Sequence, residues 1–105
     1  MDSKNFQVSS GTAVNSMSNN AKIILVGIQK KIQNLHSDIG NSGFLQQLLY
    51  EAGQLISLSD KEAGAKIERY AKGMDFYLNG GSDNLEVFYH CKAETLSIIA
   101  KHLSK

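Results

Sequence analysis

The sequence predicts an all-α protein, an antiparallel bundle of three or four helices preceded by a flexible polar N-terminal arm. Apolar residues recur at steps of three and four over several long stretches, which is the spacing of one helix face. No Pro occurs among the 105 residues, and Pro would break a helix interior. Short Gly-rich segments separate the stretches, so neighbouring helices should pack antiparallel.

Composition and charge limit the domain organisation and the classes of function that fit this sequence. The hydrophobic fraction of 42% is near the globular average, so we expect a single helical domain over residues 12–105, with residues 1–11 as the arm. The net charge of +1 provides no basic face for nucleic acid. No apolar run is long enough for membrane insertion, and the polar start lacks a signal peptide. A cytoplasmic location is expected, with export by a route that needs no signal peptide left open.

The longest periodic stretch runs from Val14 to Ile39 and predicts a central helix. Its stripe consists of Val14, Met17, Ala21, Ile24, Ile28, Ile32, Leu35 and Ile39, with Leu25 and Val26 widening the face. The Ser/Asn-rich residues 12–20 oppose helix, so the helix begins near Thr12 or near Asn20. Residues 40–43 should form a turn in which Gly40 caps the helix.

A second helix is predicted over Phe44–Ser57. Ser59 and Glu62 form a capping-box pattern, which favours a break and a third helix after it. The alternative is one long bent helix over residues 44–78, because the apolar stripe continues through Ser59. Asn79–Ser82 should form another turn. Asp83 and Glu86 then suggest the start of a last helix, with a strand over Leu85–Tyr89 as the alternative.

Few residues have the spacing expected of a metal-binding or catalytic site. Glu86, His90 and Glu94 share one helix face, but metal sites of this kind need a second His or a paired helix. The lone Cys91 is expected to be a small buried residue rather than a nucleophile. We therefore expect no catalytic residue, no metal site and no cofactor.

Aromatic residues give the strongest indication of a binding surface. Half of them should enter the core, and the rest should form an exposed contact patch, since aromatic side chains contribute much of the binding energy at interfaces. The candidate interaction residues are Tyr70, Met74, Phe76, Tyr77, Phe88 and Tyr89.

The outline over roughly residues 5–75 is a polar arm, a long helix, a Gly-containing turn and a second helix. It resembles the small helical-hairpin proteins of the type VII secretion pathway. Their Trp-x-Gly turn corresponds to Asn41-Ser42-Gly43, where the Gly is present and the Trp is not. Their export signal is an aromatic residue followed four residues later by an acidic one. Neither Tyr70 nor Tyr89 has an acidic residue at that spacing. The resemblance implies a non-catalytic helical partner or export adaptor that acts as a dimer.

The sequence thus predicts a non-enzymatic protein–protein interaction module, with a secretion-associated partner or adaptor as its specific form. Its partner is another protein, in a homo- or heterodimer. An immunity or inhibitor protein that binds a toxin or enzyme is one alternative. A metal- or thiol-dependent enzyme is the alternative from another class.

Overall fold

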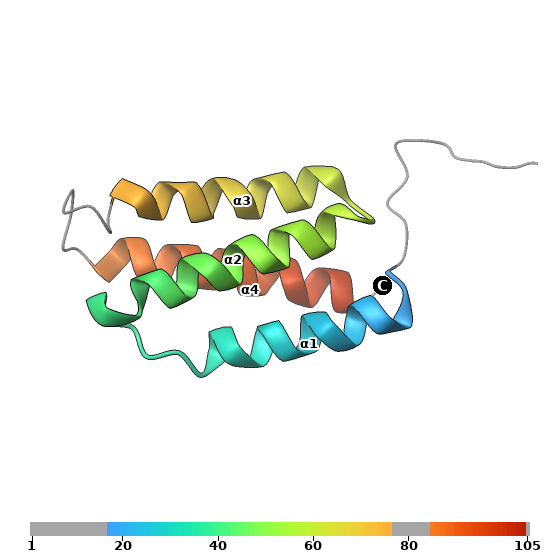
Figure 1. Ribbon diagram of the computed structural model, residues 1–105, viewed down its shortest axis with the longest axis horizontal. Helices are drawn as coiled ribbons and strands as arrows, with labels where there is room; N and C mark the ends of the chain where they lie inside the picture. The colour runs from blue at the N-terminus through green and yellow to red at the C-terminus, as the bar shows by residue number, and fades with distance from the viewer. Residues whose placement is uncertain (1–16, 77–84, 105) are drawn as a thin grey trace, which may run out of the picture.

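Four helices form an antiparallel bundle, as the sequence predicts (Figure 1). The computed structural model describes residues 17–76 and 85–104, except for the side chains of Ile39 and Phe76. The helices are α1 (Asn19–Gln33), α2 (Ser42–Ser57), α3 (Lys61–Phe76) and α4 (Leu85–Leu103), with a short 3-10 turn η1 (Ile39–Asn41) before α2. The predicted arm over residues 1–11 and the turn at residues 79–82 lie outside the described residues.

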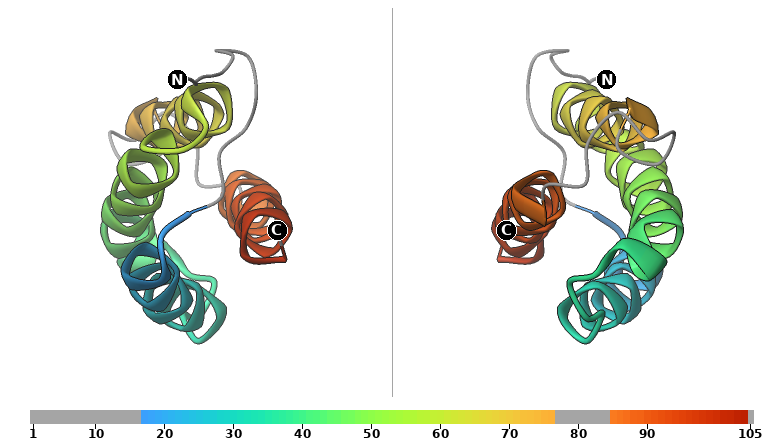
Figure 2. Two further views of the ribbon diagram at one scale, coloured as in Figure 1. Left: turned by 90° about the vertical axis from the view of Figure 1, so that its right-hand side faces the viewer. Right: turned by 90° about the vertical axis from the view of Figure 1, so that its left-hand side faces the viewer.

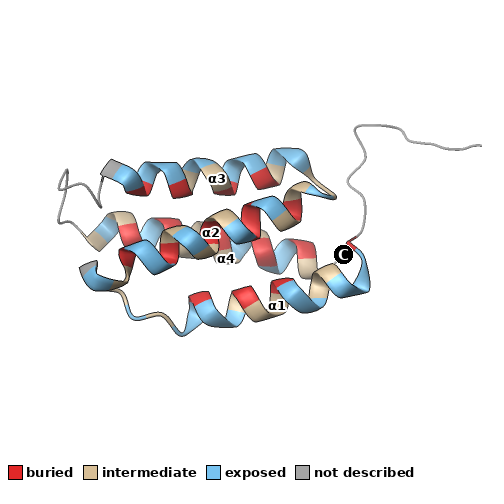
Figure 3. Cartoon of the chain, viewed as in Figure 1, coloured by how far each residue is buried: buried red, intermediate tan, exposed pale blue. Residues whose placement is uncertain are grey.

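The helices are arranged as a curved layer closed by one helix. In the end views α3, α2 and α1 form an arc, and α4 lies on its concave side (Figure 2). The buried residues face this interior from all four helices (Figure 3). The core consists of Met17, Leu25, Ile28, Ile32, Leu45, Leu49, Ala52, Ile56, Ile67, Ala71, Met74, Phe88, Cys91 and Ile99. Because α4 lies on the concave side, no described helix covers the convex face of the arc.

Helix α1 begins at Asn19, close to Asn20, the second of the two starts that the sequence predicts. Ser18 is the N-cap, and its Oγ accepts a hydrogen bond from the Ala21 N–H at 3.1 Å. Of the predicted stripe, Met17, Ile28 and Ile32 are buried, and Ala21 and Leu35 are partly buried. Val14 and the Ile39 side chain lie outside the described part. Ile24 is 55% exposed, and Leu25 is fully buried in its place. The heptad-like spacing allowed either residue, and the position of α2 and α4 around α1 decided which one enters the core.

The prediction that the first helix continues to Ile39 is wrong, as is the cap at Gly40. Helix α1 ends at Gln33 with Asn34 as its C-cap. Beyond it, the Asp38 carboxylate accepts from the Asn41 N–H, and the Asn41 amide donates to the His36 carbonyl. Such side-chain to backbone bonds compete with helix formation. Leu35 remains partly buried, and the half-buried Lys92 donates to its carbonyl at 2.8 Å.

The chain breaks between α2 and α3, which confirms the corner and excludes one long helix. The predicted capping box is shifted by one residue. Asp60, not Ser59, accepts from the first turn of α3, through the Ala63 N–H at 3.1 Å. Ser59 instead donates back to the Ile56 carbonyl. An Asp at the N-cap is as favourable as a Ser, so the sequence offered two adjacent caps and the turn geometry selected Asp60.

Helices α2 and α3 approach each other closely at Gly53 and Gly64. A Cβ on Gly64 would lie 2.5 Å from the Gly53 carbonyl oxygen, and a Cβ on Gly53 would lie 3.0 Å from the Gly64 carbonyl oxygen. By contrast, nothing lies within 4 Å of a Cβ built on Gly27 in α1. The structural requirement for glycine therefore lies at the α2–α3 contact.

Helix α4 begins at Leu85, so the strand alternative over Leu85–Tyr89 is wrong. Its buried side is formed by Phe88, Cys91, Thr95, Ile99 and His102. No strand occurs in residues 17–76 or 85–104. None of the helices in these two ranges has both the length and the apolar character needed to cross a membrane.

Candidate functional site

A hollow lies between the C-terminal half of α1 and the N-terminal half of α2. It has a volume of about 560 Å³. Its walls are formed by Lys30, Lys31, Asn34, Leu35, Phe44, Gln47, Leu48 and Glu51. Leu35, Phe44 and Leu48 supply an apolar floor, while the two lysines lie at one end. This combination of apolar lining and polar rim is typical of a binding surface.

A second hollow continues the first along the same pair of helices. It has a volume of about 400 Å³ and is lined by Ile24, Ile28, Glu51, Gln54, Leu55 and Leu58. Glu51 contributes to both hollows, so they lie next to each other along the helix pair. We call the combined feature the α1–α2 groove, defined by the residues that line the two hollows. Its α2 wall spans Phe44 to Leu58, or about 21 Å of helix rise.

Large apolar side chains are exposed along this groove. Phe44 is 64% exposed, Leu58 79% and Ile24 55%. Ile23, at 70%, is equally exposed on α1 but lines neither hollow. Single exposed apolar residues are ordinary, whereas several along one groove indicate an interaction site.

The charges of the groove are unevenly placed. Lys30 and Lys31 lie in the last turn of α1, where their charge also complements the helix dipole. Neither ammonium group has a carboxylate partner among the residues that the structure describes. Glu51, at the middle, is exposed and accepts a weak hydrogen bond from Gln47 at 3.4 Å. One end of the groove is therefore positively charged.

The aromatic residues predicted to form an interaction surface are divided between core and surface. Met74 and Phe88 are fully buried in the core. Tyr89 is 55% exposed, and Tyr70 is partly exposed. Tyr77 and the Phe76 side chain lie outside the described part of the structure. The structure thus leaves Tyr70 and Tyr89 available on α3 and α4, and neither lines the α1–α2 groove.

Tyr70 is held by α4. Its hydroxyl donates to Glu94 Oε1 at 3.3 Å, and its ring meets the His90 ring edge-on, with centroids 5.6 Å apart. Burial, followed by the negative charge of Glu94, raises the pKa of Tyr70 above its ordinary value. These contacts give Tyr70 a structural role between the two helices and leave Tyr89 as the more accessible aromatic residue.

Reasoning from the sequence missed the groove because it sought one apolar face per helix. Helix α2 has two. Leu45, Leu49, Ala52 and Ile56 enter the core, while Phe44, Leu48, Leu55 and Leu58 form a second stripe at steps of four, seven and three. This second stripe was visible in the sequence and could have indicated an outer binding face.

The residues considered for chemistry are not assembled into a reactive site. No group of three or more His, Cys, Asp or Glu side chains with metal-binding geometry occurs within residues 17–76 and 85–104. Cys91 is 4% exposed, as expected for a small buried residue. Burial raises the pKa of its thiol, and its Sγ lies 3.7 Å from the Tyr70 carbonyl oxygen. A reactive thiolate requires the opposite shift.

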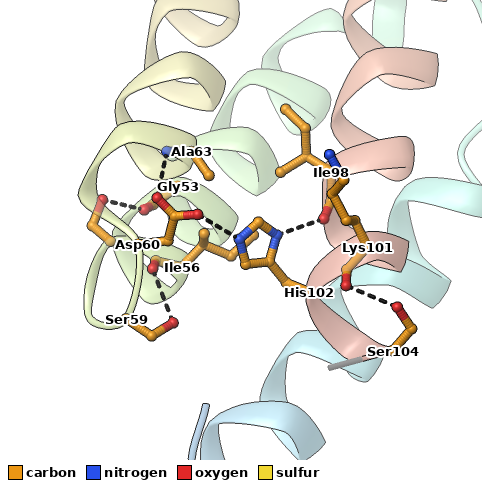
Figure 4. Close-up of polar contacts among 10 residues, drawn as sticks. Gly53, Ile56, Ser59, Asp60, Ala63, Ile98, Lys101, His102 and Ser104 are labelled. Carbon is orange, nitrogen blue, oxygen red and sulfur yellow. Dashed lines mark hydrogen bonds and ion pairs between the residues drawn. The ribbon is translucent and has the colours of Figure 1, made fainter. Parts of the chain in front are cut away.

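A buried His–Asp pair joins the end of α4 to the α2–α3 corner (Figure 4). His102 is 3% exposed, with Nε2 at 2.9 Å from Asp60 Oδ2 and Nδ1 at 2.9 Å from the Ile98 carbonyl oxygen. A neutral imidazole has one N–H and can donate to only one of these oxygens, whereas a protonated ring donates to both. Both ring nitrogens are occupied, so the pair acts as a tie between helices rather than as a base facing a substrate.

No family model matches the chain, and comparisons with curated proteins and with solved structures gave no significant match.

Proposed function

We propose that this protein is a non-enzymatic protein–protein interaction module whose binding surface is the α1–α2 groove. The observation that carries the proposal is the adjacency of the two hollows, which share Glu51, with exposed apolar side chains lining both. Burying apolar surface stabilises a complex by about 25 cal/mol per Å² before the costs of association. Phe44, Leu58 and Ile24 therefore provide more gain on binding than any polar region of the described surface.

The groove lies between α1 and α2, and no α4 residue lines either of its two hollows. The internal core does not depend on its exposed residues. A partner can therefore bind without displacing a helix, and the exposed residues Phe44, Leu58 and Ile24 can be changed without unfolding the bundle.

The specific form of the proposal is a secretion-associated partner or adaptor, the function implied by the resemblance to helical-hairpin proteins. What supports it is the antiparallel α1–α2 pair, joined through residues 34–41, on whose outer side the groove lies. An immunity or inhibitor protein would use the same groove as a monomer. The partner bound, rather than the surface used, distinguishes these two forms.

The first prediction tests the groove by site-specific cross-linking. A photoreactive phenylalanine analogue replaces Phe44, Ile23 or Tyr89, and each full-length protein is irradiated in an extract of the organism that makes it. We expect a discrete cross-linked product from position 44, lost when Ile24→Ser is added, because that change removes part of the groove lining. Ile23 is the matched control, since it is as exposed as Ile24 but lies outside both hollows.

Two outcomes contradict the proposal. Equal products from positions 44 and 23 would mean that the reagent reports exposure alone. A product from Tyr89 with none from Phe44 would place the binding surface on α4, at the aromatic patch that the sequence indicated.

A further inference from the structure

The walls of the α1–α2 groove limit what can bind there. Both walls are mostly α-helix, in which backbone N–H and C=O groups away from the helix ends are bonded within each helix. An extended peptide binds by adding a strand to a sheet edge, where free backbone groups accept it, and the groove offers no such edge. A strand in the groove would leave its own backbone groups buried without partners, which is costly. A helix satisfies these groups internally.

The length of the groove matches a short helix. Its α2 wall of about 21 Å accommodates about four turns, or 14 residues. The apolar lining is distributed along this length, with exposed Phe44 at one end, partly buried Leu48 and Leu55 between, and exposed Leu58 and Ile24 at the other. A partner helix with apolar residues at i, i+4, i+7 and i+11 would place a side chain against each part of this lining.

The charge of the groove determines the direction in which a helix would lie in it. The end nearest Phe44 carries Lys30 and Lys31, which have no carboxylate partner within residues 17–76 and 85–104. The hollow at the other end contains no Lys or Arg. Acidic side chains, together with the negative end of a helix dipole, would be favoured beside the two lysines.

From these observations we infer that the α1–α2 groove binds an amphipathic helix of another protein, about 14 residues long, with its acidic C-terminal end beside Lys30 and Lys31. This inference rests on the proposed function, because it names the occupant of the same groove. A strand, a basic helix or a second copy of this chain in the groove would contradict it.

The test is a selection from a random 16-residue peptide display library, with the full chain as bait. Binders are retained only if they lose affinity for the double variant Phe44→Ser/Leu58→Ser and keep it for Ile23→Ser. We expect the retained sequences to share helical apolar spacing and an excess of Asp and Glu in their C-terminal half. A synthetic peptide of the consensus should become helical on binding, as measured by circular dichroism.

Charge is tested separately with a matched pair of variants. Lys30→Gln/Lys31→Gln should weaken binding of the consensus peptide by roughly 2- to 10-fold at low salt, with less effect at high salt. Lys66→Gln/Lys72→Gln removes two exposed lysines of α3 and should leave affinity unchanged. Equal losses of affinity in both double variants would show that only the net charge of the protein matters. This result would overturn the assigned direction of the bound helix.

The outcomes separate this inference from the proposed function. Groove-dependent binders that are basic, or that bind without becoming helical, would overturn the inference and leave the protein-binding function in place. If the chain dimerises and Leu58→Ser abolishes the dimer, a second copy occupies the groove. This result too would overturn the inference and leave the protein-binding function in place. Absence of any groove-dependent binder would count against both.

Discussion

At the scale of single residues, the contact that most depends on chemical identity is the one between Asp60 and His102. One carboxylate oxygen caps α3, and the other receives the His102 ring. The same side chain therefore fixes the α2–α3 corner and secures the last turn of α4 to it (Figure 4). Because His102 is almost completely buried, a lost partner here is not replaced by water.

The second prediction concerns this contact. Asp60→Asn keeps an oxygen for the Ala63 N–H but replaces the acceptor oxygen beside His102 Nε2 with an uncharged amide N–H₂, so the ring can no longer donate there. We expect the free energy of unfolding to fall by about 1–3 kcal/mol, measured by urea denaturation. Asp38→Asn is the control, since exposed Asp38 also accepts a backbone N–H but has no His partner. A similar loss in both variants would contradict a specific role for the pair.

The third prediction uses the raised pKa of Cys91. Above the ordinary pKa of a thiol, about 8.5, the unfolded chain releases a proton that the folded chain retains. The unfolded state is then favoured, so stability is constant below this pH and falls as pH rises above it. Denaturation curves between about pH 7 and 9.5 should show this fall, and Cys91→Ala should reduce it. An unchanged slope in the variant would assign the fall to other groups.

At the scale of helices, α2 is the element on which both core and binding surface depend. One face of α2 enters the core, the next contacts α3, and the outer stripe forms the groove with α1. Gln46 also donates to the Ala71 carbonyl at 2.9 Å, which adds a polar link to α3. Helix α2 is thus held firmly, and the groove has a rigid wall.

The fourth prediction tests the close contact between α2 and α3. Gly64→Ala places a methyl group against the Gly53 carbonyl and the Ser57 hydroxyl, and the backbone atom cannot move aside easily. We expect a loss of about 1–3 kcal/mol in the free energy of unfolding. Gly73→Ala is in the same helix with open space around it, so it should stabilise the protein by up to about 1 kcal/mol. Thermal melts that rank the two variants in the opposite order would contradict this packing.

At the scale of the whole molecule, the four helices bury one core without help from another chain. The apolar stripe of α1 that dominates the sequence is used internally, against α2 and α4, through Leu25, Ile28 and Ile32. It is therefore not free to pair with a second copy. Among the described residues, the α1–α2 groove has the most exposed apolar side chains available for an intermolecular contact.

The fifth prediction follows from this use of the stripe. Light scattering on a sizing column should give the monomer mass of 11.5 kDa, and the purified chain should melt in one cooperative transition. Adding the helical peptide selected by the groove should raise the melting temperature, because a ligand that binds only the folded state stabilises it. A stable dimer without ligand would instead indicate that the groove binds a second copy.

The sequence alone determined the helical class, the order of the helices and most of the core. Periodicity of apolar residues is a local property, so Ile28, Ile32, Leu45, Leu49 and Ile99 could be placed on buried faces before any packing was known. The corner near Asp60 was also predictable, since capping residues act within a few positions of the chain.

The tertiary structure decided what local spacing leaves open. It placed Leu25 inside and Ile24 outside, ended α1 at Gln33, and brought His102 to Asp60 across 42 positions. It also turned the second apolar stripe of α2 into one wall of a groove, because a groove exists only when two helices lie side by side. Periodicity shows which residues share a face of one helix, and only the packing of helices decides which face is covered and which is left for a partner.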